Sequence, residues 1–415
     1  MMAKTRVPRI AVLGAGPIGL EAALYARHLG WPVTVFEKGQ PGEYVRQWGH
    51  VRLFSPFGMN TTVLGQNAIR ANNAKHEFPA DNECITGKEH VAAYLQPLAE
   101  SPLLRDCLRT ETRVVHVGRR GHLKNDLPPG DPKRSKSPFR LLLVHNNKEE
   151  EAEADVVLDC TGVYGQHRWL GDGGIPALGE IACESSIAYG LEDILGKRRQ
   201  DFAGKNILIV GTGYSAATAV CQLADLATEA TDTWIVWLSS RDGTQPIKRI
   251  HNDPLKERDR LATRANNLAT RGEGNVEFHN HTVIDRIERV NNGKAFAIAT
   301  RCRGETKTWH VDHIIANVGY LPDTSLYREL QVHECYATEG PIQLAASLLR
   351  HGGGDCLQIP ASGIDTLRNP EPNFFILGAK SYGRNSNFLL RNGFEQIREV
   401  FAFLKNDSGL NLYRG

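Results

Sequence analysis

The chain has 415 residues, of which 41% are hydrophobic and 23% charged, and this composition is typical of a globular protein with two or more domains. Its net charge of +2 gives no reason to expect nucleic acid or an anionic membrane as a partner. No apolar run approaches the roughly 20 residues of a membrane-spanning helix, and the first predicted strand begins too early to leave room for a signal peptide. We therefore expect a cytoplasmic protein.

The clearest motif lies near the N-terminus. An apolar run at 9–13 predicts a strand, residues 14–19 have the sequence Gly-Ala-Gly-Pro-Ile-Gly, and an apolar stretch from Ile18 to Leu29 predicts a helix. A second β-rich run at 33–36 closes on Glu37. This order of strand, tight glycine turn, helix and strand is that of a dinucleotide-binding βαβ unit.

Each glycine of this motif has its own physical role. Gly14 permits the tight turn, Gly16 lets the backbone approach a pyrophosphate, and Gly19 lets helix and strand pack closely. The start of the helix then offers unpaired N–H groups and a partial positive charge to phosphates. Glu37 lies 18 residues after Gly19, where an acid commonly binds the ribose hydroxyls of an adenosine. The alternative to a dinucleotide site is a glycine turn with a purely structural role.

Residues 41–60 are rich in glycine, proline and aromatic side chains and show no regular periodicity, so they predict a long ordered loop of a kind that often carries function. Within it, Trp48, His50 and Arg52 either line a cofactor or substrate cavity or only pack the loop against its domain. The next expected elements are a helix at 87–104 and a strand at 112–117.

Residues 124–138 have three prolines before Pro138 together with Lys, Arg, Ser and Asp, and they predict a mobile surface loop with solvated basic side chains. Strands are expected at 139–144 and 154–159, joined by a polar turn at Asn146-Asn147. The second strand runs into Cys160-Thr161-Gly162, a small-residue turn. In an open α/β sheet, ligands bind at this carboxyl edge of the strands.

The motif recurs in the second half, with a strand at 206–210, the turn Gly211-Thr212-Gly213-Tyr214-Ser215-Ala216, a helix to Leu226 and a strand at 234–238. This last strand ends at Ser239-Ser240-Arg241 and has no acid in the position of Glu37. A serine and an arginine suit a 2′-phosphate, because a guanidinium binds phosphate bidentately whereas a carboxylate would repel it. The second site should therefore prefer NADPH to NADH.

Two alternatives apply to the basic residues of this second site. Arg241 could instead be a surface charge beside a turn, and Lys248 and Arg249 are further candidates for the same phosphate. A strand-rich meander is expected next, at 275–278, 281–290 and 294–300, with a turn at Asn291-Asn292-Gly293. A strand at 311–316 then leads to Asn317-Val318-Gly319-Tyr320, which parallels the earlier run at 155–164. One fold used twice implies two dinucleotides in one chain.

The eight cysteines are Cys84, Cys107, Cys160, Cys183, Cys221, Cys302, Cys335 and Cys356. None forms a CxxC or CxxxxC pair, so the sequence predicts neither a metal site nor a vicinal redox disulfide. Most are expected to be small buried side chains. A single reactive thiol among them is the alternative.

The order of elements resembles that of the flavoproteins with two dinucleotide-binding domains. These include thioredoxin reductase-like pyridine nucleotide–disulfide oxidoreductases, flavin-containing and Baeyer–Villiger monooxygenases, and N-hydroxylating monooxygenases. The resemblance implies an α/β fold with two Rossmann-like domains of three-layer ββα architecture. It also implies an FAD-binding domain at 1–200 and 313–415, with an NAD(P)H-binding domain inserted at 201–312.

The same resemblance implies which residues hold the cofactors. FAD would be held by Gly14, Gly16, Pro17, Ile18, Gly19, Glu37, Lys38, Val114, Cys160, Thr161, Gly162 and Gly378. NADPH would be held by Gly211, Gly213, Tyr214, Ser215, Ala216, Ser240, Arg241 and Gly319. A helix at about 387–404 would point its N-terminus towards the flavin ring, where positive potential stabilises a reduced flavin. The residues placed there are Ser381, Tyr382, Arg384 and Asn385, with a helix cap and entry loop as the alternative.

This chain departs from the patterns of the resembled families at three places. Ala379 replaces the aspartate of the Gly-Asp pair in the reductases, which argues against a disulfide reductase but not against FAD. The segment 181–189 stands where the flavin-containing and Baeyer–Villiger enzymes carry FxGxxxHxxx(W/Y), and no CxxC is present. The sequence leaves the catalytic residues unknown, with Arg52, Tyr382, Arg384 and Asn385 as candidates.

The resemblance implies an FAD-dependent NAD(P)H oxidoreductase in which NADPH reduces FAD. We expect the electrons to pass to dioxygen plus a small organic substrate, as in the monooxygenases. One alternative is an NADPH-dependent reductase of a small disulfide or another organic acceptor without a CxxC relay, of the bacillithiol disulfide reductase type. Another is a non-catalytic, redox-sensing flavoprotein.

Overall fold

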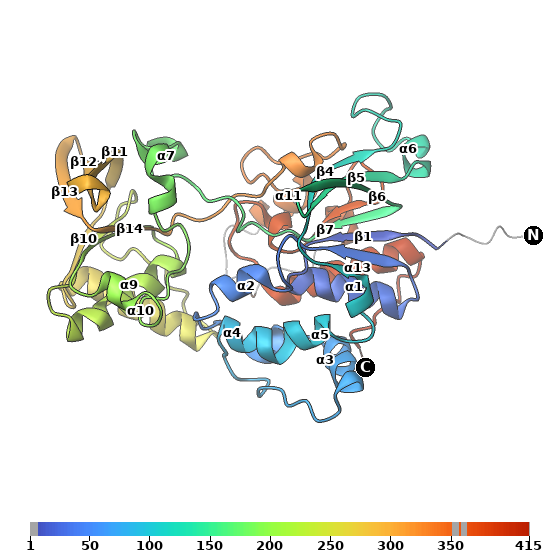
Figure 1. Cartoon of the computed structure of the whole chain (residues 1–415), viewed down its shortest axis with the longest axis horizontal. Coiled ribbons are helices and arrows are strands. Elements are labelled where there is room, and N and C mark those ends of the chain that lie inside the picture. The colour runs from blue at the N-terminus through green and yellow to red at the C-terminus, as the bar shows by residue number, and fades with distance from the viewer. Residues whose placement is uncertain (1–6, 351–356, 358–362, 415) are drawn as a thin grey trace, which may run out of the picture. The chain divides into compact units, whose positions relative to one another are not determined.

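The computed structural model describes residues 7–350, 357 and 363–414 (Figure 1). Within these residues the chain divides into two compact units. The first unit contains the described residues up to Gln166 and from Leu321 onwards, and the second unit is His167–Tyr320.

The first unit is built on a five-stranded parallel sheet in the order β15-β7-β1-β2-β3. The strands are β1 (Ile10–Leu13), β2 (Val33–Phe36), β3 (Leu108–Arg109), β7 (Val156–Asp159) and β15 (Phe374–Ile376). Ile10 lies opposite Val33 on one side and Val156 on the other, and the whole of β1 is buried. Because both faces of a parallel sheet are covered, its central strand is a continuous apolar run.

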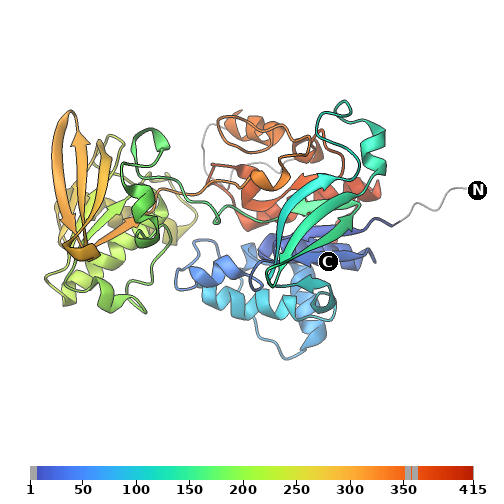
Figure 2. The ribbon, with the colours of Figure 1, turned by 45° about the horizontal axis from the view of Figure 1, so that its top comes forward.

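Two layers cover this sheet (Figures 1 and 2). The covering elements are α1 (Pro17–His28) and α13 (Leu390–Lys405) on one face and the antiparallel meander β4 (Thr112–Arg119), β5 (Phe139–His145) and β6 (Lys148–Ala154) on the other. Ile10 and Val12 of β1 share a core with the helices, whereas Ala11 and Leu13 share a core with the meander. Alternate residues of one strand thus supply two cores. The three-layer architecture expected from the sequence is confirmed.

The remaining described helices of the first unit are α2 (Glu43–Gln47), α3 (Val63–Asn72), α4 (Gly87–His90), α5 (Gln96–Ala99), α6 (Pro132–Lys136), α11 (Ile342–Arg350) and α12 (Ile364–Leu367). A π-helical turn lies at Val91–Leu95, and 3-10 turns lie at Phe57–Met59, Arg105–Cys107, Ser325–Tyr327 and Gly378–Tyr382. Residues 41–60, predicted to be a loop, therefore contain α2 and a 3-10 turn. The helix predicted over 87–104 ends at Ala99, and the last helix begins at Leu390 rather than at 387.

The second unit repeats this plan, with a parallel sheet in the order β10-β9-β8-β14 and a meander in the order β11-β12-β13. Ile207 and Ile209 of β8 pack with the helices α9 and α10, whereas Leu208 packs with the meander. The elements are β8 (Asn206–Val210), β9 (Trp234–Leu238), β10 (Val276–His279), β11 (Thr282–Val290), β12 (Ala295–Cys302), β13 (Glu305–Val311), β14 (His313–Ala316), α7 (Glu180–Cys183), α8 (Arg199–Phe202), α9 (Tyr214–Glu229) and α10 (Lys256–Arg271), with 3-10 turns at Asp172–Gly174, Glu184–Ser186 and Asn291–Gly293.

The strands of both meanders differ from the sequence prediction. Residues 275–278 were predicted to open the second meander, but β10 pairs in parallel with β9 instead. The strands β6 and β13 were missed, because both are polar edge strands whose side chains are mostly exposed. Charged side chains suit a sheet edge, since they discourage pairing with another chain. They also hide the apolar alternation by which a strand is recognised.

The second unit begins at His167 rather than at 201 and ends at Tyr320 rather than at 312. Three isolated bridges explain the earlier start. Gly171 pairs with Ile284 and Leu178 pairs with Arg286, both in β11, and Ala188 pairs with Ile315 of β14. These contacts fasten the segment after Gln166 to the second sheet and meander.

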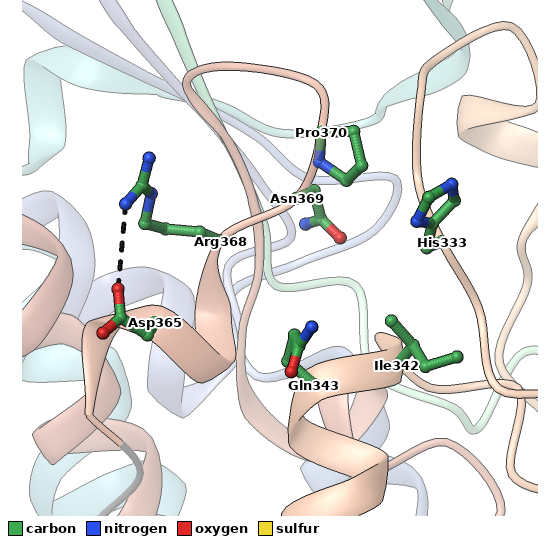
Figure 3. A pocket seen from close by; sticks show the side chains of 7 residues that line it. All are labelled: His333, Ile342, Gln343, Asp365, Arg368, Asn369 and Pro370. Carbon is green, nitrogen blue, oxygen red and sulfur yellow. Dashed lines mark ion pairs between the residues drawn. The ribbon is translucent and has the colours of Figure 1, made fainter. Parts of the chain in front are cut away.

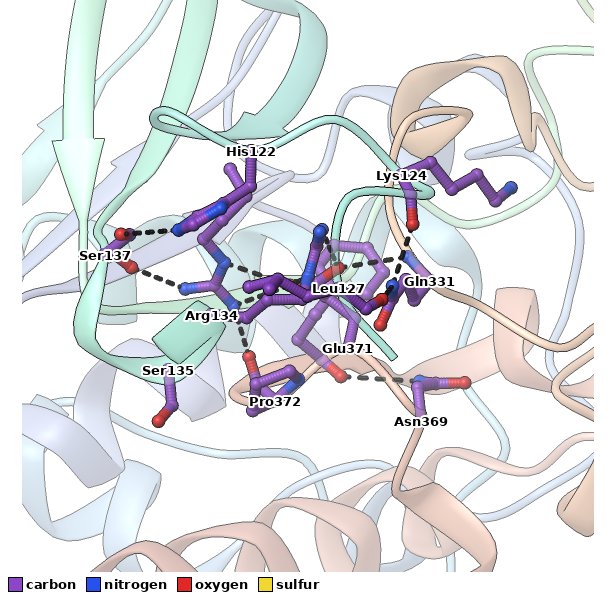
Figure 4. Close-up of polar contacts among 12 residues, drawn as sticks. His122, Lys124, Leu127, Arg134, Ser135, Ser137, Gln331, Asn369, Glu371 and Pro372 are labelled. Atoms are coloured by element: carbon purple, nitrogen blue, oxygen red, sulfur yellow. Dashed lines mark hydrogen bonds and ion pairs between the residues drawn. The ribbon is translucent and has the colours of Figure 1, made fainter. Parts of the chain in front are cut away.

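The expectation of a mobile loop with solvated basic residues at 124–138 is wrong for Arg134 (Figure 4). Its side chain is fully buried, and its Nη2 lies 2.6 Å from Oε2 of Glu371. Arg119, also fully buried, has its Nε 2.9 Å from Oε1 of the same carboxylate. Burial alone would raise the pKa of Glu371, but hydrogen bonds from Arg134 and from the backbone of Gln331 outweigh it and lower the pKa. The loop is therefore anchored to a segment far away in the sequence.

Candidate dinucleotide-binding sites

The first glycine turn joins β1 to α1. Gly14 has φ +93°, and a Cβ there would lie 2.9 Å from the carbonyl oxygen of Cys160. A Cβ at Gly19 would lie 1.9 Å from the oxygen of Gly14, so the helix packs directly on the turn. A Cβ at Gly16 would meet nothing within 4 Å. The backbone at Gly16 therefore has open space beside it, as close approach of a phosphate requires.

Glu37 follows the last residue of β2 and is 7% exposed. Its carboxylate accepts hydrogen bonds from the backbone N–H of Ala15 at 2.7 Å and of Gly39 at 2.9 Å. The side chain thus connects the strand end to the glycine turn. Lys38, the next residue, donates to the hydroxyl of Tyr44 and lies over its ring.

The turn Cys160-Thr161-Gly162 lies at the end of β7, above a buried ion pair that the sequence did not predict. Nζ of Lys380 is 2.6 Å from Oδ2 of Asp159 and 3.0 Å from Oγ1 of Thr161. The hydroxyl of Thr161 donates to Oδ1 of Asp159 at 2.7 Å. The one hint of this ion pair in the sequence is that Lys380 directly follows Ala379, the position at which the resembled reductases carry an aspartate. Burial raises the pKa of the Cys160 thiol well above its usual value, so this thiol stays protonated.

Two other residues expected near FAD, Gly378 and Val114, lie in different layers of the first unit. A Cβ at Gly378 would lie 3.2 Å from Cγ1 of Ile18, so this glycine packs on the first turn of α1. Val114 is half-buried against the core between sheet and meander, and the register of β4 on β5 shifts between Val114 and His116.

The four catalytic candidates all have partners within the chain. Arg52 donates to the carbonyl of Cys84, in a segment separate from the other three. Tyr382 is buried, and its hydroxyl accepts from the Asn392 amide at 3.1 Å. Nη2 of Arg384 lies 2.5 Å from Oε1 of Glu339, and Oδ1 of Asn385 accepts from the backbone N–H of Asn387 at 3.0 Å. The last three candidates therefore gather before α13 as an entry loop.

Two ring nitrogens in the loop predicted to carry function lack a partner among the described residues. These are Nε1 of Trp48 and Nε2 of His50, both buried, in the segment that follows α2. Buried polar atoms are almost always hydrogen-bonded in native proteins. The ring of Trp48 packs on Gly87 at the start of α4, where a Cβ would lie 2.6 Å from Cζ3 of Trp48.

The second glycine turn joins β8 to α9 with the same geometry. Gly211 has φ +137°, and a Cβ there would lie 2.3 Å from the carbonyl oxygen of Asn317. A Cβ at Gly213 would meet nothing within 4 Å, so this turn also has open space. Ala216, in the position of Gly19, is fully buried. Tyr214, Ser215 and Ala216 form the first turn of α9. Gly319, two residues after Asn317, has φ +94°.

The end of β9 differs from the end of β2. Ser239 stands where the first unit has Glu37, and its Oγ accepts from the backbone N–H of Arg241 at 3.0 Å. Ser240 and the side chain of Arg241 are exposed. Asp242, the acid nearest in sequence, lies 3.4 Å from a guanidinium nitrogen of Arg303. Of the further candidates, Arg249 lies 2.9 Å from Asp259, and Lys248 is exposed.

Two cavities of the first unit lie elsewhere. One of about 420 Å³ is lined by His333, Ile342, Gln343, Asp365, Arg368, Asn369 and Pro370 (Figure 3). A second, of about 480 Å³, shares His333 and Pro370 with it. None of these residues was predicted to bind a cofactor. Among the described residues, no helix is long and apolar enough to cross a membrane, and no cluster of His, Cys, Asp and Glu suits a metal ion.

Residues 11–123 match the family described as pyridine nucleotide-disulphide oxidoreductase. Bacillithiol disulfide reductase Bdr (YpdA) from Bacillus cereus has a similar structure, with TM-score 0.70, 17% identity and coverage of 96% of this chain and 99% of that chain. Ornithine N-hydroxylase KtzI from Kutzneria, in a complex with reduced FAD, NADP⁺ and L-ornithine, gives TM-score 0.63, 14% identity and coverage of 97% and 99%. The chain has the fold of the two-dinucleotide-binding-domain flavoproteins.

A curated relative adds a local match to this fold. The NAD-dependent dihydropyrimidine dehydrogenase subunit PreT from Salmonella typhimurium is 49% identical over 68 residues. These residues are 16% of this chain and 15% of that protein, so the chain matches only a small part of the relative's length. The likeness of the whole chain to the two-domain flavoproteins rests on the two solved structures and is confirmed at the level of the fold.

Proposed function

We propose that this protein is an FAD-dependent NAD(P)H oxidoreductase that binds FAD in its first unit and NADPH in its second. The observation that carries the proposal is the repeated open turn, at Gly16 and at Gly213, with a carboxylate beside one turn and an arginine beside the other. The likeness to a structure that holds reduced FAD and NADP⁺ supports it.

In the first unit, FAD would be bound by the backbone and by two strand ends. The N–H groups at the start of α1 would bind the pyrophosphate. Glu37 would accept hydrogen bonds from the ribose hydroxyls while keeping those from the backbone N–H groups of Ala15 and Gly39, because a carboxylate has about four acceptor sites. The full set proposed is Gly14, Gly16, Pro17, Ile18, Gly19, Glu37, Lys38, Val114, Cys160, Thr161, Gly162 and Gly378. Bound FAD would supply the electron transfer, which amino-acid side chains do not provide.

In the second unit, the exposed Arg241 would bind the 2′-phosphate of NADPH. The neutral Ser239 places no carboxylate at the strand end, so the phosphate meets a cation there without repulsion. The turn would bind the pyrophosphate at the start of α9. The full set proposed is Gly211, Gly213, Tyr214, Ser215, Ala216, Ser240, Arg241 and Gly319.

For the electron acceptor, we propose dioxygen together with a small organic substrate, as in the monooxygenases. Ala379 removes the acid of the disulfide reductases, and the sequence has no CxxC relay. The cysteine beside the first site, Cys160, has a pKa raised well above its usual value by burial, and a protonated thiol is unsuited to attack a disulfide.

Reduction of a small disulfide is the second candidate function, and the lowered pKa of the Cys335 thiol favours it. A hydrogen bond with the Thr338 side chain lowers the pKa of this thiol, and a lower pKa favours the reactive thiolate. A bacillithiol disulfide reductase also has the same fold over 96% of this chain.

NADPH oxidation by the purified protein, measured in air and under nitrogen, separates these candidates. Oxygen-dependent oxidation that an amine, thioether or ketone stimulates, with formation of an oxygenated product, supports the monooxygenase. Oxidation under nitrogen that a disulfide stimulates and that Cys335→Ser abolishes supports the reductase. A protein that binds FAD but oxidises NADPH under neither condition contradicts both candidates and favours a redox sensor.

A further inference from the structure

We propose that Trp237 is a positioning residue that holds the second glycine turn in the conformation that binds the pyrophosphate of NADPH. Trp237 lies in β9 and its side chain is fully buried. Its indole N–H donates a hydrogen bond of 2.8 Å to the carbonyl oxygen of Gly211. This role rests on the proposed function of the second unit.

A hydrogen bond fixes the corresponding peptide group of the glycine turn in both units, at its N–H in the first unit and at its C=O in the second. In the first unit, Glu37 accepts from the N–H of the peptide between Gly14 and Ala15. In the second unit, Trp237 donates to the C=O of the peptide between Gly211 and Thr212. Because the C=O and N–H of a trans peptide point in opposite directions, either bond sets the orientation of the whole group.

The strand registers show that Trp237 has no counterpart in the first unit. Leu13 lies opposite Phe36, and Val210 lies opposite Leu238, so Trp237 corresponds to Val35. Valine has no polar group that could hold the turn, and there the carboxylate of Glu37 does so.

The change of partner has a consequence for ligand charge. A carboxylate at the end of β9 would orient the turn but would also repel a 2′-phosphate. The neutral indole N–H of Trp237 orients the turn from within β9 and adds no negative charge at the end of this strand. Trp237 therefore makes a rigid turn compatible with a phosphorylated ribose.

The test is Trp237→Phe, with Trp309→Phe as its matched control. Trp309 is also a buried tryptophan of the second unit, and its indole N–H donates to Oγ1 of Thr300 in the meander at 3.1 Å, away from the turn. Each variant loses one buried indole hydrogen bond, so both should lose similar stability. Only Trp237→Phe should weaken NADP⁺ and NAD⁺ binding, by about fivefold to tenfold for each, because both nucleotides share the pyrophosphate. The Michaelis constant for NADPH should rise by the same factor, with kcat little changed.

A double variant tests the same role by restoring a hydrogen bond to the other end of the turn peptide. Adding Ser239→Glu restores a carboxylate of the kind found at Glu37, so Trp237→Phe/Ser239→Glu should regain binding of NAD⁺ but not of NADP⁺. Failure of the double variant to bind NAD⁺ overturns the proposal, as does a Trp237→Phe variant that binds both nucleotides as tightly as Trp309→Phe. A wild-type protein that binds neither nucleotide overturns the proposed function itself.

Discussion

The two units of this protein keep one backbone arrangement while changing the side chains around it. The N–H of Gly14 bonds to Phe36 O at 2.7 Å, and the N–H of Gly211 bonds to Leu238 O at 3.2 Å. The meander strands start at the same place in both units, since the N–H groups of Thr112 and Thr282 each donate at 2.8 Å to the carbonyl oxygen of the strand-end residue, Glu37 or Ser239.

The comparison of the two units shows which parts of each nucleotide site depend on the backbone and which depend on side chains. A main-chain hydrogen bond joins the turn to the neighbouring strand in both units, so the strand-end side chain can change without loss of the fold. The orientation of the turn peptide depends on a side chain, which is Glu37 in one unit and Trp237 in the other. An acid there suits ribose hydroxyls, and a serine followed by an arginine suits a phosphate. The comparison therefore predicts that each unit can be disabled for its own nucleotide alone.

The largest expected effect comes from aspartate at the open glycines. Gly16 and Gly213 have φ −75° and φ −94°, which other residues adopt readily, and a Cβ at either meets open space. The fold should therefore tolerate Gly16→Asp and Gly213→Asp. A carboxylate beside the pyrophosphate would repel it, so each variant should weaken one nucleotide by more than about 100-fold.

The two variants are controls for each other. Gly16→Asp should be purified without FAD yet still bind NADP⁺, whereas Gly213→Asp should keep its FAD and lose NADP⁺ binding. FAD content by absorbance and NADP⁺ binding by calorimetry measure both. Loss of the same nucleotide in both variants would contradict the assignment of one cofactor to each unit.

The next effect concerns the helix that follows each turn. Glu21 in α1 is fully buried, with Thr62 Oγ1 at 3.0 Å and the Tyr94 hydroxyl as partners, and burial raises its pKa to about 7. The corresponding residue of α9 is Thr218, which bonds to the backbone of its own helix. The folded pKa of Glu21 exceeds the unfolded value of 4.5, so its protonation stabilises the fold fully below that value. This stabilisation is lost as the pH rises through about 7.

Glu21→Gln mimics the protonated acid and should remove this dependence. Between about pH 5 and pH 8, the free energy of unfolding of the wild type should fall relative to that of the variant by up to about 3 kcal/mol. Urea unfolding at several pH values measures the difference. Thr218→Val serves as the control, because it should change the free energy of unfolding equally at every pH.

The smallest effect concerns the phosphate alone. Arg241→Ala should raise the Michaelis constant for NADPH by about tenfold, the value of a charge-assisted hydrogen bond, and leave that for NADH nearly unchanged. Arg249→Ala is the control, since Arg249 already pairs with Asp259. Equal effects of Arg241→Ala on the two nucleotides would remove Arg241 from the 2′-phosphate.

The sequence predicted what is local and failed where distant residues meet. The roles expected of Gly14 and Gly19 follow from spacing, and the fold gives both the close contacts that a side chain would block. The pairing of Arg134 with Glu371 could not be predicted, because a basic residue in a polar, proline-rich segment has no local sign of burial. The ion pair of Asp159 with Lys380 was not predicted either, because its two partners are 221 residues apart in the sequence.

Trp237 illustrates a third limit of sequence reasoning. In an apolar strand, a tryptophan predicts only a core side chain, and its hydrogen bond to Gly211 depends on the register of β8 and β9. The strand itself was predicted, but the direction of one indole N–H was not. A polar atom on an otherwise apolar residue is the kind of site feature that only coordinates reveal.

The absorption spectrum of the purified protein, recorded during titration with NADPH under nitrogen, tests the central claim most directly. Two different nucleotides bound by one chain predict a yellow protein that carries about one FAD per chain and loses its visible absorbance when NADPH is added. A colourless protein that takes up no FAD even from an excess would contradict the account.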